Sequence, residues 1–161
     1  MNNESATMTI NETLAEHILT RTEQEMNRLQ EEAMAIVDRY WEWRTKENQS
    51  RKATEQSRLA LRVHKRDGGA FQVEWYAYEL RRTKKGEAKQ RYISIKKGSG
   101  LRYPKPTLAQ YARDWEIDHV CAIDAKLAKV RRDVRNLVRV RFAIRLYAQP
   151  DGLGHATPDR A

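Results

Sequence analysis

An α+β fold is predicted for this chain of 161 residues, because its hydrophobic period changes along the sequence. Apolar residues recur at spacings of three and four towards both ends, which is typical of amphipathic helices. In the middle they alternate with polar residues, as in strands. The connections between the alternating segments are short and favour an antiparallel meander. The predicted order is a long helix, a three-stranded antiparallel sheet, a short helix and a long C-terminal helix. We expect the long helices to pack together on one face of the sheet.

The first predicted helix spans residues 11–48 and follows residues 1–10, which we expect to be disordered. Its apolar seam has heptad-like spacing. The seam consists of Ala15, Leu19, Thr22, Met26, Leu29, Ala33, Ile36, Tyr40 and Trp43. Such a seam is long for a domain of this size to cover by itself. It therefore predicts either a hairpin with the last helix or an intermolecular coiled coil, and we expect a dimer or higher oligomer.

Three strands are predicted within the basic region, residues 49–148, which opens with a polar linker. The first begins near Leu59, the second covers about 70–81, and the third runs through 91–95. Asp67-Gly68-Gly69 and Thr83–Gly86 mark the two turns. One face of the second strand carries Phe71, Val73, Trp75 and Ala77, so we expect Trp75 to be a buried anchor. The other face carries Tyr76 and Tyr78, and these two residues and Tyr92 either pack the sheet against the helices or line a nucleic-acid surface between the basic runs.

Two helices are predicted after the sheet. A loop rich in glycine and proline leads to Thr107, a suitable N-cap for a short helix over 108–114. The last helix covers about 116–148 and has its own apolar seam. This seam consists of Ile123, Leu127, Val130, Val134, Leu137, Arg141 and Ile144. Residues 149–161 are expected to be disordered.

Charge is distributed unevenly along the chain. The net charge is +9, from 31 Lys and Arg against 22 Asp and Glu. Residues 1–48 hold 5 basic and 10 acidic residues, whereas residues 49–106 hold 16 basic and 5 acidic ones. Attraction to a polyanion depends on local potential, so this pattern favours a nucleic-acid partner over acidic proteins or anionic lipids.

Several other classes are disfavoured by what the sequence lacks. It contains no apolar run long enough for a membrane span and no apolar leader, so we expect a cytoplasmic protein. The four histidines are scattered, no phosphate-binding loop occurs, and the only cysteine is Cys121, which we expect to be a buried apolar thiol. We therefore expect neither an enzyme nor a cofactor or metal.

Candidate DNA-binding residues gather in three places. The second hairpin projects cations into solvent, and the loop after the third strand adds glycines and a tyrosine ring that can stack on a base. The last helix carries an arginine stripe, which can equally lie along DNA or pair with glutamates of the first helix. The hairpin candidates are Arg81, Arg82, Lys84, Lys85, Lys89 and Arg91, the loop candidates are Lys96, Lys97, Arg102, Tyr103 and Lys105, and the helix candidates are Arg131, Arg135 and Arg139.

With these residues in view, the chain resembles the MobI family of conjugative transfer proteins. The resemblance depends on Glu74-Trp75-Tyr76, Arg91-Tyr92-Ile93, the run from Lys97 to Pro104 and the arginine-rich closing helix, and it covers roughly residues 57–147. It implies a DNA-binding auxiliary mobilisation factor, acting at the origin of transfer alongside a relaxase. The implied partners are double-stranded DNA and possible contacts to that relaxase.

Two other functions stay open on the residues alone. One is a phage or plasmid regulator that binds DNA or RNA. The other is a coiled-coil adaptor that binds protein and never contacts nucleic acid. Salt dependence separates them, since a protein that contacts several phosphates loses about 10³-fold or more in affinity as salt rises.

Overall fold

The computed structural model describes residues 3–149, apart from the side chains of residues 3–12, Leu80 and Arg81. Its elements are α1 (Asn3–Gln49), β1 (Leu59–Lys65), the single 3₁₀ turn η1 (Asp67–Gly69), β2 (Phe71–Arg82), β3 (Ala88–Ser94), α2 (Lys105–Ala109) and α3 (Ile117–Ala148). This order confirms the predicted α+β class.

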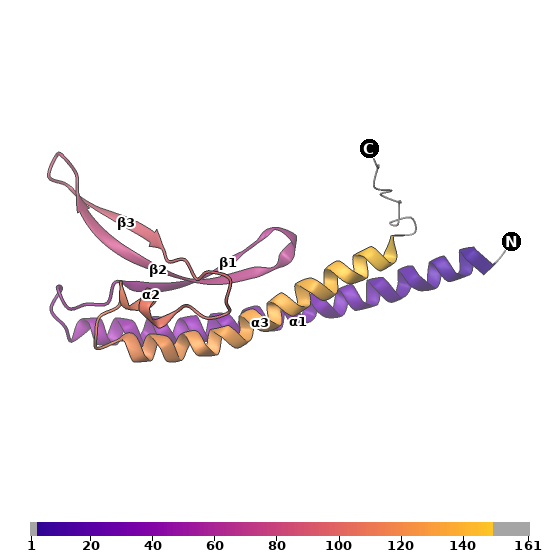
Figure 1. Cartoon of the computed structure of the whole chain (residues 1–161), viewed down its shortest axis with the longest axis horizontal. Coiled ribbons are helices and arrows are strands. Elements are labelled where there is room, and N and C mark those ends of the chain that lie inside the picture. Colours follow the sequence, from indigo (N-terminus) through magenta and orange to yellow (C-terminus); the bar gives the residue numbers. More distant parts are fainter. Residues whose placement is uncertain (1–2, 150–161) are drawn as a thin grey trace, which may run out of the picture.

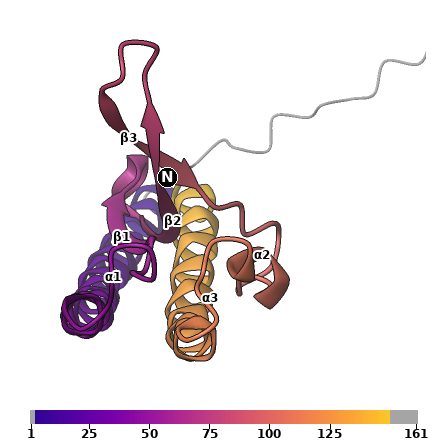
Figure 2. The ribbon, with the colours of Figure 1, turned by 90° about the vertical axis from the view of Figure 1, so that its left-hand side faces the viewer.

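The chain forms two layers, with the sheet on one side and the two long helices on the other (Figure 1). Viewed end-on, α1 and α3 lie next to each other beneath the sheet, and α2 lies beside α3 (Figure 2). The two helices run in opposite directions, so α1 and α3 form a hairpin within one chain. The predicted packing of the helices on one face of the sheet is therefore confirmed.

The apolar seam of α1 lies against α3 and the sheet. Met26, Leu29, Ala33 and Tyr40 are buried in the core that also contains residues of α3. The hydroxyl of Thr22, the polar residue in the seam, donates a hydrogen bond to the carbonyl of Leu19 at 2.8 Å. The helix begins at Asn3, earlier than the expected start at residue 11. Of the two arrangements that the seam predicted, the intramolecular hairpin is the one present.

The sheet is an antiparallel meander in the order β1-β2-β3. Phe71, Val73, Trp75 and Ala77 are all buried on the face that covers the helices, so Trp75 is the anchor that the alternation predicted. The outer edge of β1 is covered by α1. The Tyr40 hydroxyl donates to the Leu59 carbonyl at 3.1 Å, and Trp41 Nε1 donates to the Leu61 carbonyl at 3.0 Å. These bonds satisfy an edge that would otherwise attract another strand.

The short helix differs from its prediction. It was expected over residues 108–114 with Thr107 as N-cap, but α2 spans Lys105–Ala109 and Pro104 occupies the N-cap position. Pro106 lies in the first turn, where its missing N–H has no helical partner to lose. The predicted last helix agrees with α3 to within one residue. The tail predicted to be disordered lies, except for Gln149, outside the described residues.

Candidate nucleic-acid interface

The second hairpin extends well beyond the rest of the sheet. β1 pairs with β2 only as far as Ala77, so the remainder of β2 pairs with β3 alone. We call this two-stranded segment, residues 78–92, the basic ribbon. Figures 1 and 2 show its tip projecting away from both long helices. The turn is closed by bonds between the backbones of Thr83 and Glu87 (2.8 Å) and of Gly86 and Thr83 (2.9 Å). Gly86 has a φ of 83°, which a residue with a side chain adopts only at a cost.

The predicted hairpin cations line this ribbon in contact with solvent. Arg82, Lys84, Lys85, Lys89 and Arg91 are all exposed. Arg81 belongs to β2, but its side chain lies outside the described set. Cations on a projecting turn reach phosphates without a rearrangement of the fold, so the ribbon can offer positive charge to a polyanion.

Three tyrosines form a cluster at the root of the ribbon. The rings of Tyr76, Tyr78 and Tyr92 lie 5.1 to 5.9 Å from one another. Arg62 lies over Tyr76 at 5.5 Å and Arg44 lies over Tyr78 at 5.5 Å. Burial, together with the neighbouring Tyr76 hydroxyl, raises the pKa of Tyr78 to about 12.

Of the two arrangements left open for these tyrosines, burial between the sheet and the helices is not the one present. Side chains alternate across a strand, so Tyr76 and Tyr78 lie on the face opposite the buried Trp75. There the rings pack on one another. The cluster fixes the base of the ribbon, and Tyr92, 61% exposed, remains open to a ligand.

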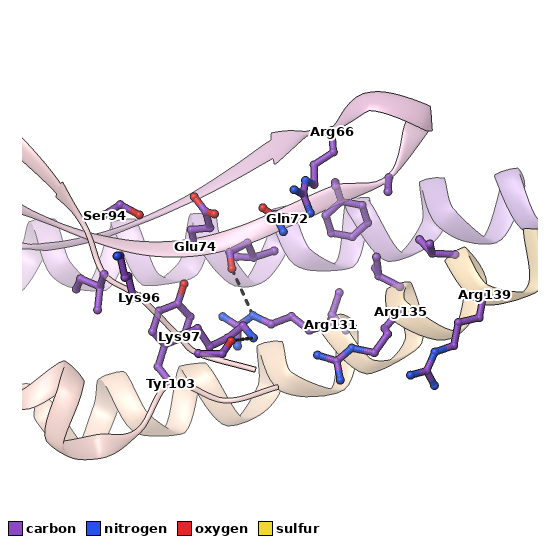
Figure 3. A pocket seen from close by; sticks show the side chains of 18 residues that line it. Arg66, Gln72, Glu74, Ser94, Lys96, Lys97, Tyr103, Arg131, Arg135 and Arg139 are labelled. Atoms are coloured by element: carbon purple, nitrogen blue, oxygen red, sulfur yellow. Dashed lines mark hydrogen bonds between the residues drawn. The ribbon is translucent and has the colours of Figure 1, made fainter. Parts of the chain in front are cut away.

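A second basic surface lies between β2 and α3. A groove of about 830 Å³ is lined by residues 70–74, the segment 94–98 that follows β3, and α3. We call it the basic groove (Figure 3). It brings Lys96 and Lys97 together with Arg131, Arg135 and Arg139, which project from successive turns of α3. With Tyr103, which also lines the groove, six candidates from two of the predicted clusters share one site.

Two of the other predicted contacts are directed elsewhere. Arg102 donates to the Cys121 carbonyl at 3.4 Å, and Lys105 forms an ion pair with Asp118 at 2.9 Å. Both side chains are exposed, but they lie beside the start of α3 and do not line the basic groove. The loop cluster of the prediction is therefore divided between two surfaces.

A buried carboxylate, that of Asp124, organises the floor beneath the groove. It accepts hydrogen bonds from Trp75 Nε1 at 3.1 Å, from the Tyr103 N–H at 2.8 Å and from Arg131 Nη1 at 2.8 Å. Arg131 also donates to the carbonyls of Val73 (3.3 Å) and Leu101 (2.9 Å). One side chain of α3 thus ties together the sheet, the loop and the helix.

This arrangement corrects two site predictions. The Arg131 side chain is only 10% exposed and forms an ion pair with Asp124, so it belongs to the framework and not to the arginine stripe on the surface. Tyr103 is buried, and Arg131 lies over its ring at 5.1 Å, so that ring is not available to stack on a base. In both cases the reason is tertiary: a buried Asp124 needs these donors to satisfy its oxygens.

Several positive charges lie close together in the basic groove. Loss of water around Lys97 lowers its pKa, and the charges of Arg131 and Arg135 lower it further. The acidic first helix does not relieve this charge. Glu25 and Glu32 pair with Arg28 on the same helix. Among the residues whose side chains are described, no α3 arginine forms an ion pair with an α1 carboxylate.

Sequence reasoning missed two buried acids. Asp124 was hidden within an apolar seam, although Arg131, seven residues later on the same helical face, was a usable signal. Glu116 is fully buried before α3 and accepts from the Arg113 N–H at 2.8 Å. Burial raises its pKa above the ordinary value. The sequence around Glu116, a single acid that follows Trp115, gives no comparable signal that the acid is buried.

Cys121 and His119 both lie near the start of α3. Burial raises the pKa of Cys121, which disfavours the reactive thiolate. His119 stacks on Trp43, with ring centres 3.8 Å apart. Within residues 3–149 no group of three or more His, Cys, Asp or Glu side chains could hold a metal, and no helix is both long and apolar enough to span a bilayer.

The fold and these surfaces define a small basic α+β protein with a projecting β-ribbon. The family model described as MobI protein matches residues 29–145, which is more than two thirds of the chain. The chain therefore belongs to the MobI family, and it is a mobilisation-related protein of conjugative transfer. No curated protein and no solved structure matches it.

Proposed function

We propose that this protein is a DNA-binding auxiliary factor that acts at the origin of transfer and helps a relaxase to begin DNA processing. It catalyses no reaction itself in this proposal. Membership of the MobI family supports the setting of mobilisation. The cytoplasm, where a relaxase meets its DNA, is the corresponding location.

The observation that carries the proposal is the basic ribbon. Its exposed cations lie on two strands that, within the described chain, no third strand pairs with beyond Ala77. The major groove of B-DNA, about 12 Å wide, admits a two-stranded β-ribbon, whose strands lie about 4.8 Å apart. Lys84 and Lys85 at the turn would contact phosphates, while Lys89 and Arg91 on β3 would face base edges.

Lys96, an exposed residue of the groove lining, provides a second cationic contact for the same duplex. β3, which separates the turn from Lys96 and Lys97, has seven residues and so spans about 20 Å. This spacing suits contacts at successive backbone crossings, as half a turn of duplex covers about 17 Å. The ribbon would then supply the main contacts and Lys96 a minor share.

Self-association is also part of the proposal. Val138, Phe142 and Leu146 recur every fourth residue towards the end of α3 and are 43%, 64% and 52% exposed. An apolar stripe of this kind on a projecting helix supports contact with a second copy. The duplex that such a dimer binds would present two half-sites.

A salt titration tests DNA binding by the ribbon. Lys84→Ala combined with Lys85→Ala should weaken binding to all duplexes and lower the slope of log affinity against log salt by about 2. Lys126→Ala combined with Lys129→Ala removes the same charge from exposed positions on α3 and should leave the slope unchanged. Equal slopes for both double variants would refute the role of the ribbon. A salt-independent wild type would favour the protein adaptor.

A further inference from the structure

The first half of β2 has an open edge. β1 pairs with β2 from Phe71 to Ala77, whereas β3 pairs with it only from Tyr76 onward. The Trp75 carbonyl accepts from the Ile95 N–H at 3.2 Å on the β3 side. Backbone groups that face one edge belong to alternate residues, so those of Val73 and Phe71 face this edge too. The Val73 carbonyl accepts from Arg131 Nε at 3.3 Å, so an added strand would pair with the Val73 N–H and with the backbone groups of Phe71. Within the described chain no strand lies beside them.

The basic groove runs along this open edge. Its opposite wall is α3, where Val130, Val134 and Val138 recur every fourth residue and line the groove. Ala70, Phe71, Val73 and Ile95 complete the apolar part of the lining. A groove between a strand edge and a helix, with backbone donors along one wall and apolar side chains below, is the geometry that accepts an added strand.

The charge of the groove selects an acidic occupant. Six of its 18 lining residues are Lys or Arg, and Glu74 is the single acid among them. That carboxylate already faces Arg62 at 3.2 Å and His64 at 3.6 Å. Arg131 is nine-tenths buried, and its Nη2 atom has no hydrogen-bond partner. Arg131 is already paired with Asp124, whereas Lys97, Arg135 and Arg139 form no ion pair with a described side chain, so a carboxylate that enters beside them stabilises their charges.

We propose that the basic groove binds an extended acidic segment of a partner protein, which adds a strand to the open edge of β2. Alternate side chains of the segment would face the valines of α3, and its carboxylates would contact Lys97, Arg135 and Arg139. A nucleic-acid strand fits less well, because it offers no peptide backbone to pair with Phe71 and Val73 and leaves the apolar lining uncovered. This binding does not depend on the DNA-binding role of the ribbon.

Selection from a phage-displayed library of random decapeptides tests the proposal on the full chain. The enriched peptides should carry at least three Asp or Glu residues alternating with apolar residues. Arg135→Glu combined with Arg139→Glu should weaken the best peptide at least 30-fold by fluorescence anisotropy. Arg132→Glu combined with Arg145→Glu reverses two charges on the same helix outside the groove and should change its affinity less than threefold.

Amide exchange tests the added strand directly. With the enriched peptide bound, exchange of the Val73 N–H should slow at least tenfold, and N-methylation at alternate peptide positions should abolish binding. Three results would overturn the proposal: no acidic enrichment, equal affinity for both double variants, or an unchanged Val73 exchange rate. Displacement of the peptide by a single-stranded oligonucleotide that itself loses affinity in the Arg135→Glu, Arg139→Glu variant would instead make the groove a nucleic-acid site.

Discussion

Replacement of Asp124 by alanine should destabilise the protein more than removal of any other single carboxylate whose contacts are described. Asp124 is fully buried and accepts three hydrogen bonds, one of them from the buried guanidinium of Arg131. Breaking a buried ion pair by removing one partner costs about 3–5 kcal/mol, because the other charge stays buried without compensation. Two further donors, Trp75 Nε1 and the Tyr103 N–H, lose their acceptor as well.

Urea unfolding followed by tryptophan fluorescence measures this cost. With an m value of roughly 2 kcal/mol/M, a loss of about 4 kcal/mol lowers the midpoint by about 2 M. Asp133→Ala is the matched control, since Asp133 lies on the same helix in an exposed pair with Arg132 at 2.9 Å. This control should change stability by less than about 1 kcal/mol.

A double-mutant cycle tests whether the ion pair between Asp124 and Arg131 is the source of this loss of stability. Asp124→Ala and Arg131→Ala each break the same interaction, so the double variant should cost less than the sum of the two, by roughly 2–3 kcal/mol. A cost below about 1 kcal/mol for Asp124→Ala, or strict additivity in the cycle, would refute the view that this pair joins sheet, loop and helix.

Three other outcomes are expected. Trp75→Ala should cost about 3–5 kcal/mol in urea unfolding, since the indole is fully buried; a folded variant that lost only DNA affinity would contradict this. Burial raises the pKa of Glu116 above its ordinary value of 4.5, so the native state holds a proton that the unfolded state releases. Its contribution to stability should therefore fall as pH rises from 4.5 through that raised pKa, and Glu116→Gln should remove this component of the pH profile; parallel profiles would refute it. Phe142→Glu should shift the oligomer to monomer by light scattering at micromolar concentration, and an already monomeric wild type would refute self-association.

The elements were largely predictable because local patterns determine them. The alternation from Phe71 to Ala77 placed four residues on the buried face, and the turns followed from glycines that adopt positive φ, such as Gly68 at 80° and Gly86 at 83°. The seam of α1 was equally readable. The sequence did not show which helix packs on this seam, because a heptad pattern suits an intramolecular and an intermolecular partner helix alike.

The candidate site was less predictable because it depends on tertiary contacts. Lys97, Arg135 and Arg139 share one groove only because the loop after β3 returns to α3. Arg131 looked like its surface neighbours in sequence, but it is held inward by Asp124. The ribbon projects because β1 is shorter than β2, and a pattern of alternating residues does not reveal where a neighbouring strand stops.

Hydroxyl-radical footprinting on intergenic DNA that carries the element's own origin of transfer tests the central claim most directly. Wild-type protein should protect a discrete backbone segment there at a concentration that leaves scrambled DNA of the same length unprotected. Lys84→Ala combined with Lys85→Ala should lose this protection, whereas Lys126→Ala combined with Lys129→Ala should retain it. Equal protection of origin and scrambled DNA, or unchanged protection by the ribbon variant, would contradict origin binding through the ribbon.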